Sequence, residues 1–187
     1  FTNKAAGEMR ERVEKLVGTC PGMWIMTFHA MSLRILREHC EAVGYQRNFV
    51  VYDTVDQKTL IKNIMKEQNI DTKLYPQAYL SAAISKQKEN DVSPQAYLET
   101  EGDNFRSKVI YRVYRAYQDQ LKRNNAMDFD DLLVNALHVL RDNPDIFEEI
   151  SELVRQNADK LYAKSIKGGS APKPVEKAEE EESPEQA

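Results

Sequence analysis

The stretch from residue 75 to residue 124 shows only helical periodicity, and it restricts the fold more than any other feature of the chain. Apolar residues recur there every three or four positions, as Val109 and Val113 do. Pro76 and Pro94 each stand where a helix can begin. The pattern predicts a helical subdomain over residues 75–124, with a start nearer residue 55 as the alternative.

Residues 1–74 mix helical and strand signals. Residues 23–28 (MWIMTF) form an apolar run behind a Pro-Gly pair, which is typical of a buried parallel strand. A second, β-rich run covers Phe49–Tyr52, and Thr54 and Gln57 follow it with the spacing of a capping box. The predicted fold is therefore mostly α with a small parallel β component.

Residues 125–166 predict two further helices. The first starts at Asp128, and the second restarts at Asn143 with Pro144 in its first position. Asp130 and Asp131 fall in the first turn of the first helix, where carboxylates favour the helix dipole, so we interpret them as structural and not as metal ligands. Residues 167–187 are rich in Gly, Pro, Ala and Glu, and they predict a disordered acidic tail with the default role of a solubilising linker.

The tail explains the net charge of −4. It holds six Glu and two Lys between residues 170 and 187, so residues 1–169 are neutral overall. Six Lys and Arg residues between 106 and 123 alternate with Tyr111, Tyr114 and Tyr117, whose spacing marks one helix face. Packing inside the helical subdomain is the favoured role of these tyrosines over stacking on nucleic acid, and the basic side chains can be a solvated face.

Other sequence features bear on location and redox chemistry. We find no apolar run long enough to span a membrane and no secretion signal, so we expect a cytoplasmic protein without a membrane partner. Cys20 and Cys40 lack the spacing of a metal or redox motif, and we expect reduced thiols and no metal site. Trp24 is interpreted as a core residue because its neighbours are apolar.

Three stretches together resemble one family, the UvrD, Rep and PcrA group of superfamily 1 DNA helicases. They are FTNKAAGEMRERV at the start, MTFHAMSLRILR, and YRVYRAYQDQLKRNNAMDFDDLL. The resemblance covers residues 1–150. It implies a partial P-loop-type α/β motor domain that carries a helical insert, with residues 125–166 returning to the motor domain.

The resemblance also implies a site for single-stranded or partly duplex DNA. An aromatic ring can stack on any base, and small polar groups with helix-terminal amides can hold phosphates without reading sequence. The residues at the positions that contact DNA in this family are Phe1, Thr2, Asn3, Lys4, Thr27, Phe28 and His29. From the residues alone, Thr2 or Asn3 is a helix cap, Phe1 a frayed terminus and His29 a hydrogen-bonded structural residue.

The family uses ATP and magnesium, but the chain has neither the Gly-Lys-Thr or Gly-Lys-Ser loop nor the Asp-Glu pair that would hold them. We therefore expect a helicase fragment that has no cofactor of its own, does not hydrolyse ATP by itself and works with the remaining helicase domains. The alternative is a non-enzymatic interaction or DNA-binding module derived from a helicase. A metal-dependent enzyme that uses Asp128, Asp130 and Asp131 is the third and weakest hypothesis.

Overall fold

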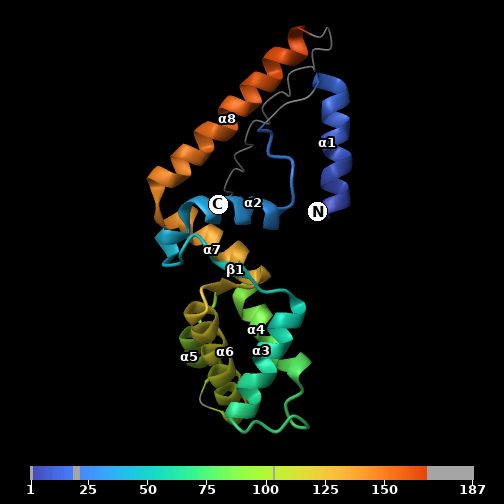
Figure 1. Cartoon of the computed structure of the whole chain (residues 1–187). Helices are drawn as coiled ribbons and strands as arrows, with labels where there is room; N and C mark the ends of the chain where they lie inside the picture. The colour runs from blue at the N-terminus through green and yellow to red at the C-terminus, as the bar shows by residue number, and fades with distance from the viewer. Residues whose placement is uncertain (1, 19–21, 103, 168–187) are drawn as a thin grey trace, which may run out of the picture.

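The computed structural model describes residues 2–18, 22–102 and 104–167, and helices dominate it (Figure 1). Phe1 and residues 168–187, which include nearly all of the predicted acidic tail, lie outside the described residues. The described elements, in chain order, are α1 (Asn3–Val17), α2 (Phe28–His39), the 3-10 helix η1 (Cys40–Val43), β1 (Val50–Val51), α3 (Thr54–Glu67), α4 (Gln77–Glu89), α5 (Pro94–Glu101), α6 (Phe105–Arg123), β2 (Ala126–Met127), α7 (Phe129–Asp142) and α8 (Pro144–Lys167). The prediction of a mostly helical chain with a small parallel β component is confirmed.

Most helix starts follow from capping residues that are visible in the sequence. Thr2 caps α1, Asn104 caps α6 and Asp128 caps α7, each with a side-chain oxygen that accepts a hydrogen bond from a first-turn amide. Pro94 and Pro144 are the first residues of α5 and α8, where the missing N–H costs no helical hydrogen bond. Local chemistry therefore fixes these boundaries before any tertiary contact forms.

The capping box predicted at Thr54 and Gln57 is wrong by one residue. Asp53 caps α3 instead, and its carboxylate accepts hydrogen bonds from the backbone amides of Val55 and Asp56. The Asp56 side chain in turn accepts from the Asp53 amide at 3.1 Å. An ionised carboxylate is a stronger acceptor than a threonine hydroxyl, so the reciprocal pair forms one residue upstream.

The buried strand predicted over residues 23–28 is also wrong. Residues 23–25 have no regular secondary structure and are half-buried, and Phe28 is already the first residue of α2. A parallel strand needs a neighbouring strand for its backbone groups, and the described part of the chain offers this run no such neighbour. The run instead leads into the cap of α2 at Thr27.

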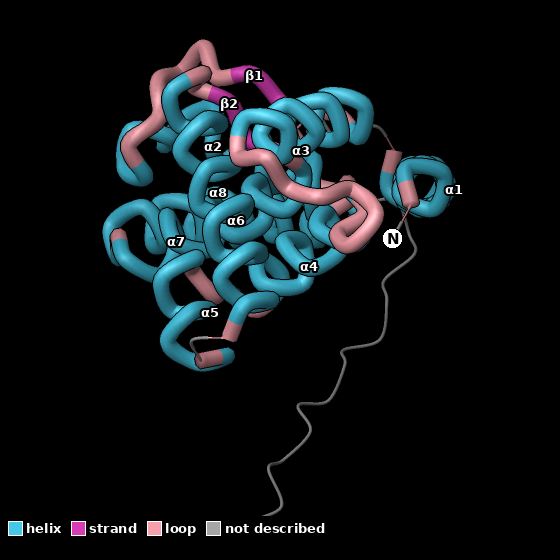
Figure 2. Tube along the Cα trace, turned by 90° about the horizontal axis from the view of Figure 1, so that it is seen from below, coloured by secondary structure: helices cyan, strands magenta, loops and turns pink. Residues whose placement is uncertain are grey.

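The small sheet is formed by β1 and β2, which pair in parallel with Val50 opposite Ala126 and Val51 opposite Met127 (Figure 2). β1 is shorter than the predicted run Phe49–Tyr52, and β2 was not predicted because two residues carry no periodicity. Neighbouring residues of a strand point to opposite faces. Accordingly Ala126 lies in one hydrophobic core and Met127 in another.

The first of these cores belongs to the helical bundle, which we define as α3 to α6. Its buried residues come from all four helices and include Ile61, Leu80, Tyr97, Val113 and Leu121. Figure 1 shows the bundle as the lower part of the molecule. α3, which begins at residue 54, contributes to this core, in keeping with the alternative of a subdomain that starts nearer residue 55.

The tyrosines at the centre of α6 pack as predicted. Tyr114 and Tyr117 are buried in the bundle core, and Tyr111 packs against it half-buried. The rings of Tyr114 and Tyr117 are therefore not available to stack on a nucleic acid.

The second core lies between α2 and α7, and we call it the α2–α7 core. It contains Ile35 and Leu36 of α2, Leu132 and Ala136 of α7, and Phe49 from the loop before β1. Partly buried residues from α8 and from the segment before α2, Trp24 among them, pack against it. The prediction of Trp24 as a core residue is confirmed.

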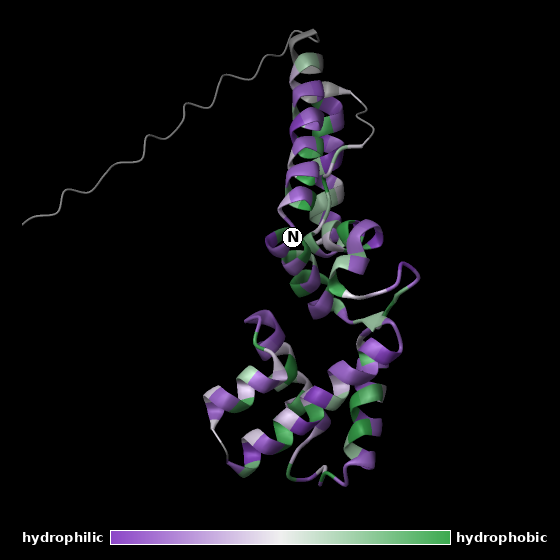
Figure 3. Cartoon of the chain, turned by 90° about the vertical axis from the view of Figure 1, so that its left-hand side faces the viewer, coloured by the Kyte–Doolittle hydropathy of each residue, from purple (hydrophilic) through white to green (hydrophobic). Residues whose placement is uncertain are grey.

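Helices α1 and α8 form the upper part of the molecule in Figure 1, and Figure 3 shows it above the bundle from the side. α1 contacts α8 and is tied to the segment before α2 by Arg10, whose guanidinium donates to the Ile25 carbonyl at 2.8 Å. α8 leaves most of its side chains exposed beyond residue 151. Within the described residues, no helix combines the length and apolarity that crossing a membrane requires.

Candidate nucleic-acid interface

The amino ends of α1 and α2 are built in the same way. Thr2 Oγ1 accepts a hydrogen bond from the Ala5 amide, and Thr27 Oγ1 accepts one from the Ala30 amide, both at 3.2 Å. Each threonine thus binds one of the four first-turn amides that a helix cannot satisfy internally. Thr2 and Thr27 are therefore the N-caps of α1 and α2.

The first turns of both helices also lack acidic residues. Helices α4, α5 and α6 lack them as well, whereas α3, α7 and α8 each carry aspartate in the first turn, which neutralises the positive end of the helix dipole. The ends of α1 and α2 therefore keep the partial positive charge that attracts a phosphate. In the view of Figure 1 both helices begin on the right-hand side of the upper part.

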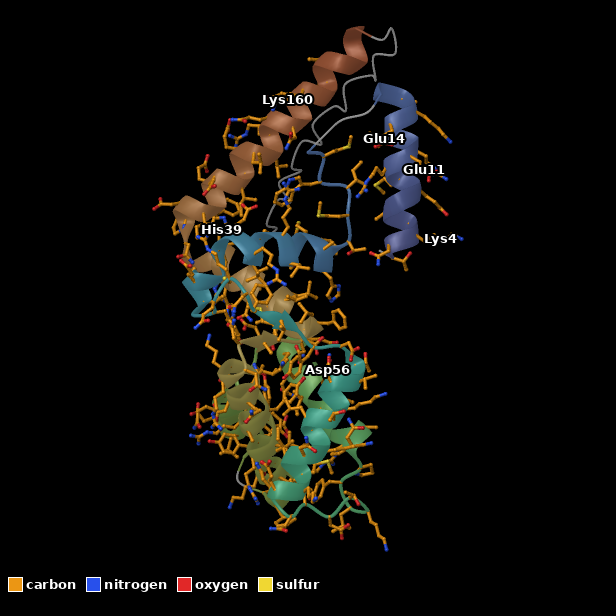
Figure 4. The ribbon with its side chains drawn as sticks, viewed as in Figure 1. Lys4, Glu11, Glu14, His39, Asp56 and Lys160 are labelled. Atoms are coloured by element: carbon orange, nitrogen blue, oxygen red, sulfur yellow. The ribbon has the colours of Figure 1, made fainter. Side chains whose placement is uncertain are left out.

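The residues after Thr2 are accessible. Asn3 and Lys4 are exposed, and Figure 4 shows Lys4 projecting outward from the foot of α1, away from α2. Phe1, the aromatic residue expected to stack on a base, lies outside the described residues. The structure thus exposes one polar side chain and one cation at this end of α1.

The residues after Thr27 provide exposed aromatic surface. The Phe28 side chain is 63% exposed although it is large and apolar. His29 is also exposed, and its ring meets the Phe129 ring edge to face, with 5.9 Å between the ring centroids. Within the described residues His29 makes no hydrogen bond through its ring, so its interpretation as a hydrogen-bonded structural histidine is not supported.

Sequence reasoning missed Phe129 as part of this surface. Phe129 is the first residue of α7 and is 42% exposed. It lies within the stretch NAMDFDDLL that carries the family resemblance, but its proximity to His29 depends on α2 packing along α7. The structure therefore places His29 against Phe129 and leaves Phe28 exposed in the same turn of α2. We call these three residues the aromatic edge, while residues 3 and 4 lie on a separate helix.

The acidic residues at the start of α7 do not form a metal site. Asp128 and Asp131 both bind the Lys88 ammonium, and Asp130 accepts a hydrogen bond from the Ser85 hydroxyl at 2.6 Å. Over the described ranges, no three His, Cys, Asp or Glu side chains group as metal ligands would. Cys40 is a free, buried thiol, and Cys20 lies outside the described residues.

Comparison with known proteins places this arrangement in a family. Residues 1–156 match the model of the UvrD/REP helicase N-terminal domain. The chain is also 42% identical over 149 residues to the ATP-dependent DNA helicases PcrA of Staphylococcus aureus and Staphylococcus epidermidis. The chain therefore belongs to the UvrD/Rep helicase family. The aligned part covers 79% of this chain and 20% of each relative, so the chain spans about a fifth of their length.

Proposed function

We propose that this chain is the part of an ATP-dependent DNA helicase that contributes a single-stranded DNA surface from the amino ends of α1 and α2. The observation that carries the proposal is the pairing of two uncompensated helix ends with an exposed aromatic edge. Helix-end amides and Lys4 would hold phosphates, and Phe28 would stack on a base. None of these contacts reads base identity, which suits a motor that moves along any sequence.

ATP chemistry would belong to other parts of the parent helicase. The 187 residues contain no Gly-Lys-Thr, Gly-Lys-Ser or Asp-Glu sequence. Phosphates of a nucleotide and its magnesium ion need both kinds of group, so the residues present do not fit ATP. We therefore assign no step of ATP hydrolysis to this chain.

The proposal is tested by titrating a fluorescein-labelled short oligothymidylate with the chain at low salt and following fluorescence anisotropy. We expect weak binding that declines as salt is raised, because phosphate contacts release counterions. Phe28→Ala should weaken binding by about 1 to 3 kcal/mol, the value of one stacked base. Lys4→Ala should lower the slope of log affinity against log salt by about 0.7.

Phe105→Ala is the matched control, because Phe105 is an equally accessible phenylalanine, 74% exposed, at the start of α6 in the bundle. It should leave the affinity unchanged. The proposal fails if the parent chain does not bind, or if Phe28→Ala and Phe105→Ala weaken binding equally.

A second candidate, a non-enzymatic interaction module, is favoured by a different observation. Phe129, Leu133 and Leu137 recur every fourth residue on α7 and are all exposed, so they form one apolar stripe. An apolar stripe suits a protein partner better than a phosphate backbone. Absence of DNA binding in the titration, together with co-purification of a partner that Leu133→Ser abolishes, would support the module.

A further inference from the structure

The helical bundle and the α2–α7 core meet at a seam that is rich in polar contacts. On the bundle side the seam is formed by α4, α6 and the turn after α4, and on the other side by one face of α7. Each side has its own apolar core, and no apolar core residue is shared between the two clusters of described residues. The two parts are therefore joined by polar contacts and by the paired strands β1 and β2, and not by a common apolar core.

A buried ion cluster lies at the centre of this seam. The Lys88 ammonium from α4 lies 2.6 Å from Asp128 Oδ2 and 2.8 Å from Asp131 Oδ1, and at most 5% of any of the three side chains is exposed. The Tyr117 hydroxyl of α6 donates to Asp128 Oδ2 at 2.9 Å. Burial, with the negative charge of Asp128, raises the pKa of Tyr117 far above its ordinary value, so this hydroxyl stays a donor. Three helices thus converge on one cluster.

Backbone amides of α7 also hold the two carboxylates in place. The Asp131 amide donates to Asp128 Oδ1 at 2.8 Å, and the Asp128 amide donates to Asp131 Oδ2 at 3.2 Å. This capping box of α7 leaves one oxygen of each carboxylate directed at Lys88. The Gln118 amide adds a further donor to Asp131 Oδ1 at 3.2 Å.

Further polar contacts, one part-buried and the others exposed, continue the seam beyond the cluster. Ser85 donates to Asp130, and Asp91, at the turn after α4, binds His138 at 2.7 Å and Arg141 at 3.1 Å. All these partners of the bundle lie on α7. The contacts therefore form a line of specific, directional pairs along a single helix.

A buried ion pair adds little net stability compared with apolar residues of the same volume, because both charges lose their water. It does penalise any arrangement that separates the charges while they stay buried. We propose that Lys88 is a positioning residue, which, through Asp128 and Asp131, fixes the angle between the helical bundle and the α2–α7 core. The angle decides where the bundle lies relative to α2 and α7.

The inference is tested by measuring the distance between the two parts directly, so its outcome does not depend on DNA binding. Cysteines replace Asn63 on α3 and Glu38 on α2, both exposed, in a chain that carries Cys20→Ser, and both receive spin labels. Cys40 stays in place because it is buried. Double electron–electron resonance then reports the distribution of distances between the two labels.

The decisive variant is Lys88→Met, Asp128→Asn and Asp131→Asn combined. It removes every charge of the cluster, keeps an asparagine cap on α7 and leaves no buried ion unpaired. We expect a cooperative thermal transition close to that of the parent, and a distance distribution at least twice as wide. Lys88→Met alone should lower the midpoint of thermal unfolding, because it leaves two aspartates buried without their cation.

Lys86→Met is the matched control, since Lys86 is an exposed lysine on the same helix. This variant should change neither the width of the distance distribution nor the midpoint of thermal unfolding. A triple variant with the parent's narrow distribution would overturn the inference, because apolar packing would then set the angle. A triple variant that does not fold would overturn it as well, because the cluster would then hold the fold itself.

Discussion

Helices α3 and α6 of the helical bundle are amphipathic, as α1 and α8 are, but the two pairs differ in how far their apolar residues are buried. In the bundle most apolar residues of α3, α4 and α6 are buried or half-buried, although Val55 and Phe105 at the helix starts are exposed. On α1 and α8 many apolar residues are exposed, among them Met9, Leu16, Phe147, Val154 and Tyr162. Amphipathic periodicity therefore shows which face can be buried, and only available partner helices decide whether it is.

The partners of the bundle are near in sequence. Its four helices follow one another between residues 54 and 123, so each can pack as soon as the next one forms. α1 and α8 lie at opposite ends of the described chain and contact each other only at their edges. The bundle should therefore carry most of the stability, and two variant pairs test that difference, while a third variant tests the seam.

The largest effect on stability is expected when two leucines, one buried and one exposed, are each replaced by alanine. Leu80 is fully buried in the bundle, whereas Leu16 on α1 is 71% exposed. Leu80→Ala should lower the free energy of unfolding by about 2 to 5 kcal/mol, and Leu16→Ala should change it by less than about 0.5 kcal/mol. Urea unfolding followed by circular dichroism measures both, and equal losses would show that α1 is as firmly packed as the bundle.

A smaller effect is expected from two helix caps. The Ser93 hydroxyl accepts from the Ala96 amide at the start of α5, and the Thr2 hydroxyl accepts from the Ala5 amide at the start of α1. Ser93→Ala should cost about 1 kcal/mol of global stability. Thr2→Ala should instead fray α1 alone and leave the urea midpoint unchanged, which hydrogen exchange of the α1 amides would reveal. A shift of the midpoint by Thr2→Ala would contradict this expectation.

The smallest effect concerns acid stability at the seam. Burial acts to raise the pKa of Asp91, but hydrogen bonds from His138 and Arg141 and their charges outweigh it and hold the pKa below the ordinary value of 3.8. A carboxylate with a lowered pKa stabilises the folded state above its unfolded pKa, and this contribution is lost as the pH falls through the folded value.

Asp91→Asn should therefore lose less stability than the parent between about pH 5 and about pH 2. The difference should stay below about 1 kcal/mol, because the pair is partly exposed and screened by solvent. Urea midpoints across this pH range measure it. If the urea midpoint changes with pH in the same way for both proteins, Asp91 has no pH-dependent role in stability.

The sequence predicted more of the fold than of the candidate site. Helix starts at Thr2, Asn104, Asp128 and Pro144 were predictable because caps and first-turn prolines act over a few residues. The strand predicted over residues 23–28 was wrong because an apolar run of that length shows burial but not a pairing partner. The role of Thr2 and Thr27 in binding DNA stays a prediction, for which the structure supplies exposed helix ends and an aromatic edge.

What the sequence by itself determined is the set of helices, their caps and membership of a helicase family, since each depends on neighbouring residues or on matching motifs. Only the tertiary structure decided that Phe129 would lie against His29, and that Asp128 and Asp131 would face a lysine 40 or more residues earlier in the chain. The reason is physical: a carboxylate in a first turn looks the same in sequence whether water or a buried ammonium binds it. Desolvation and pairing appear only when α4 is packed on α7.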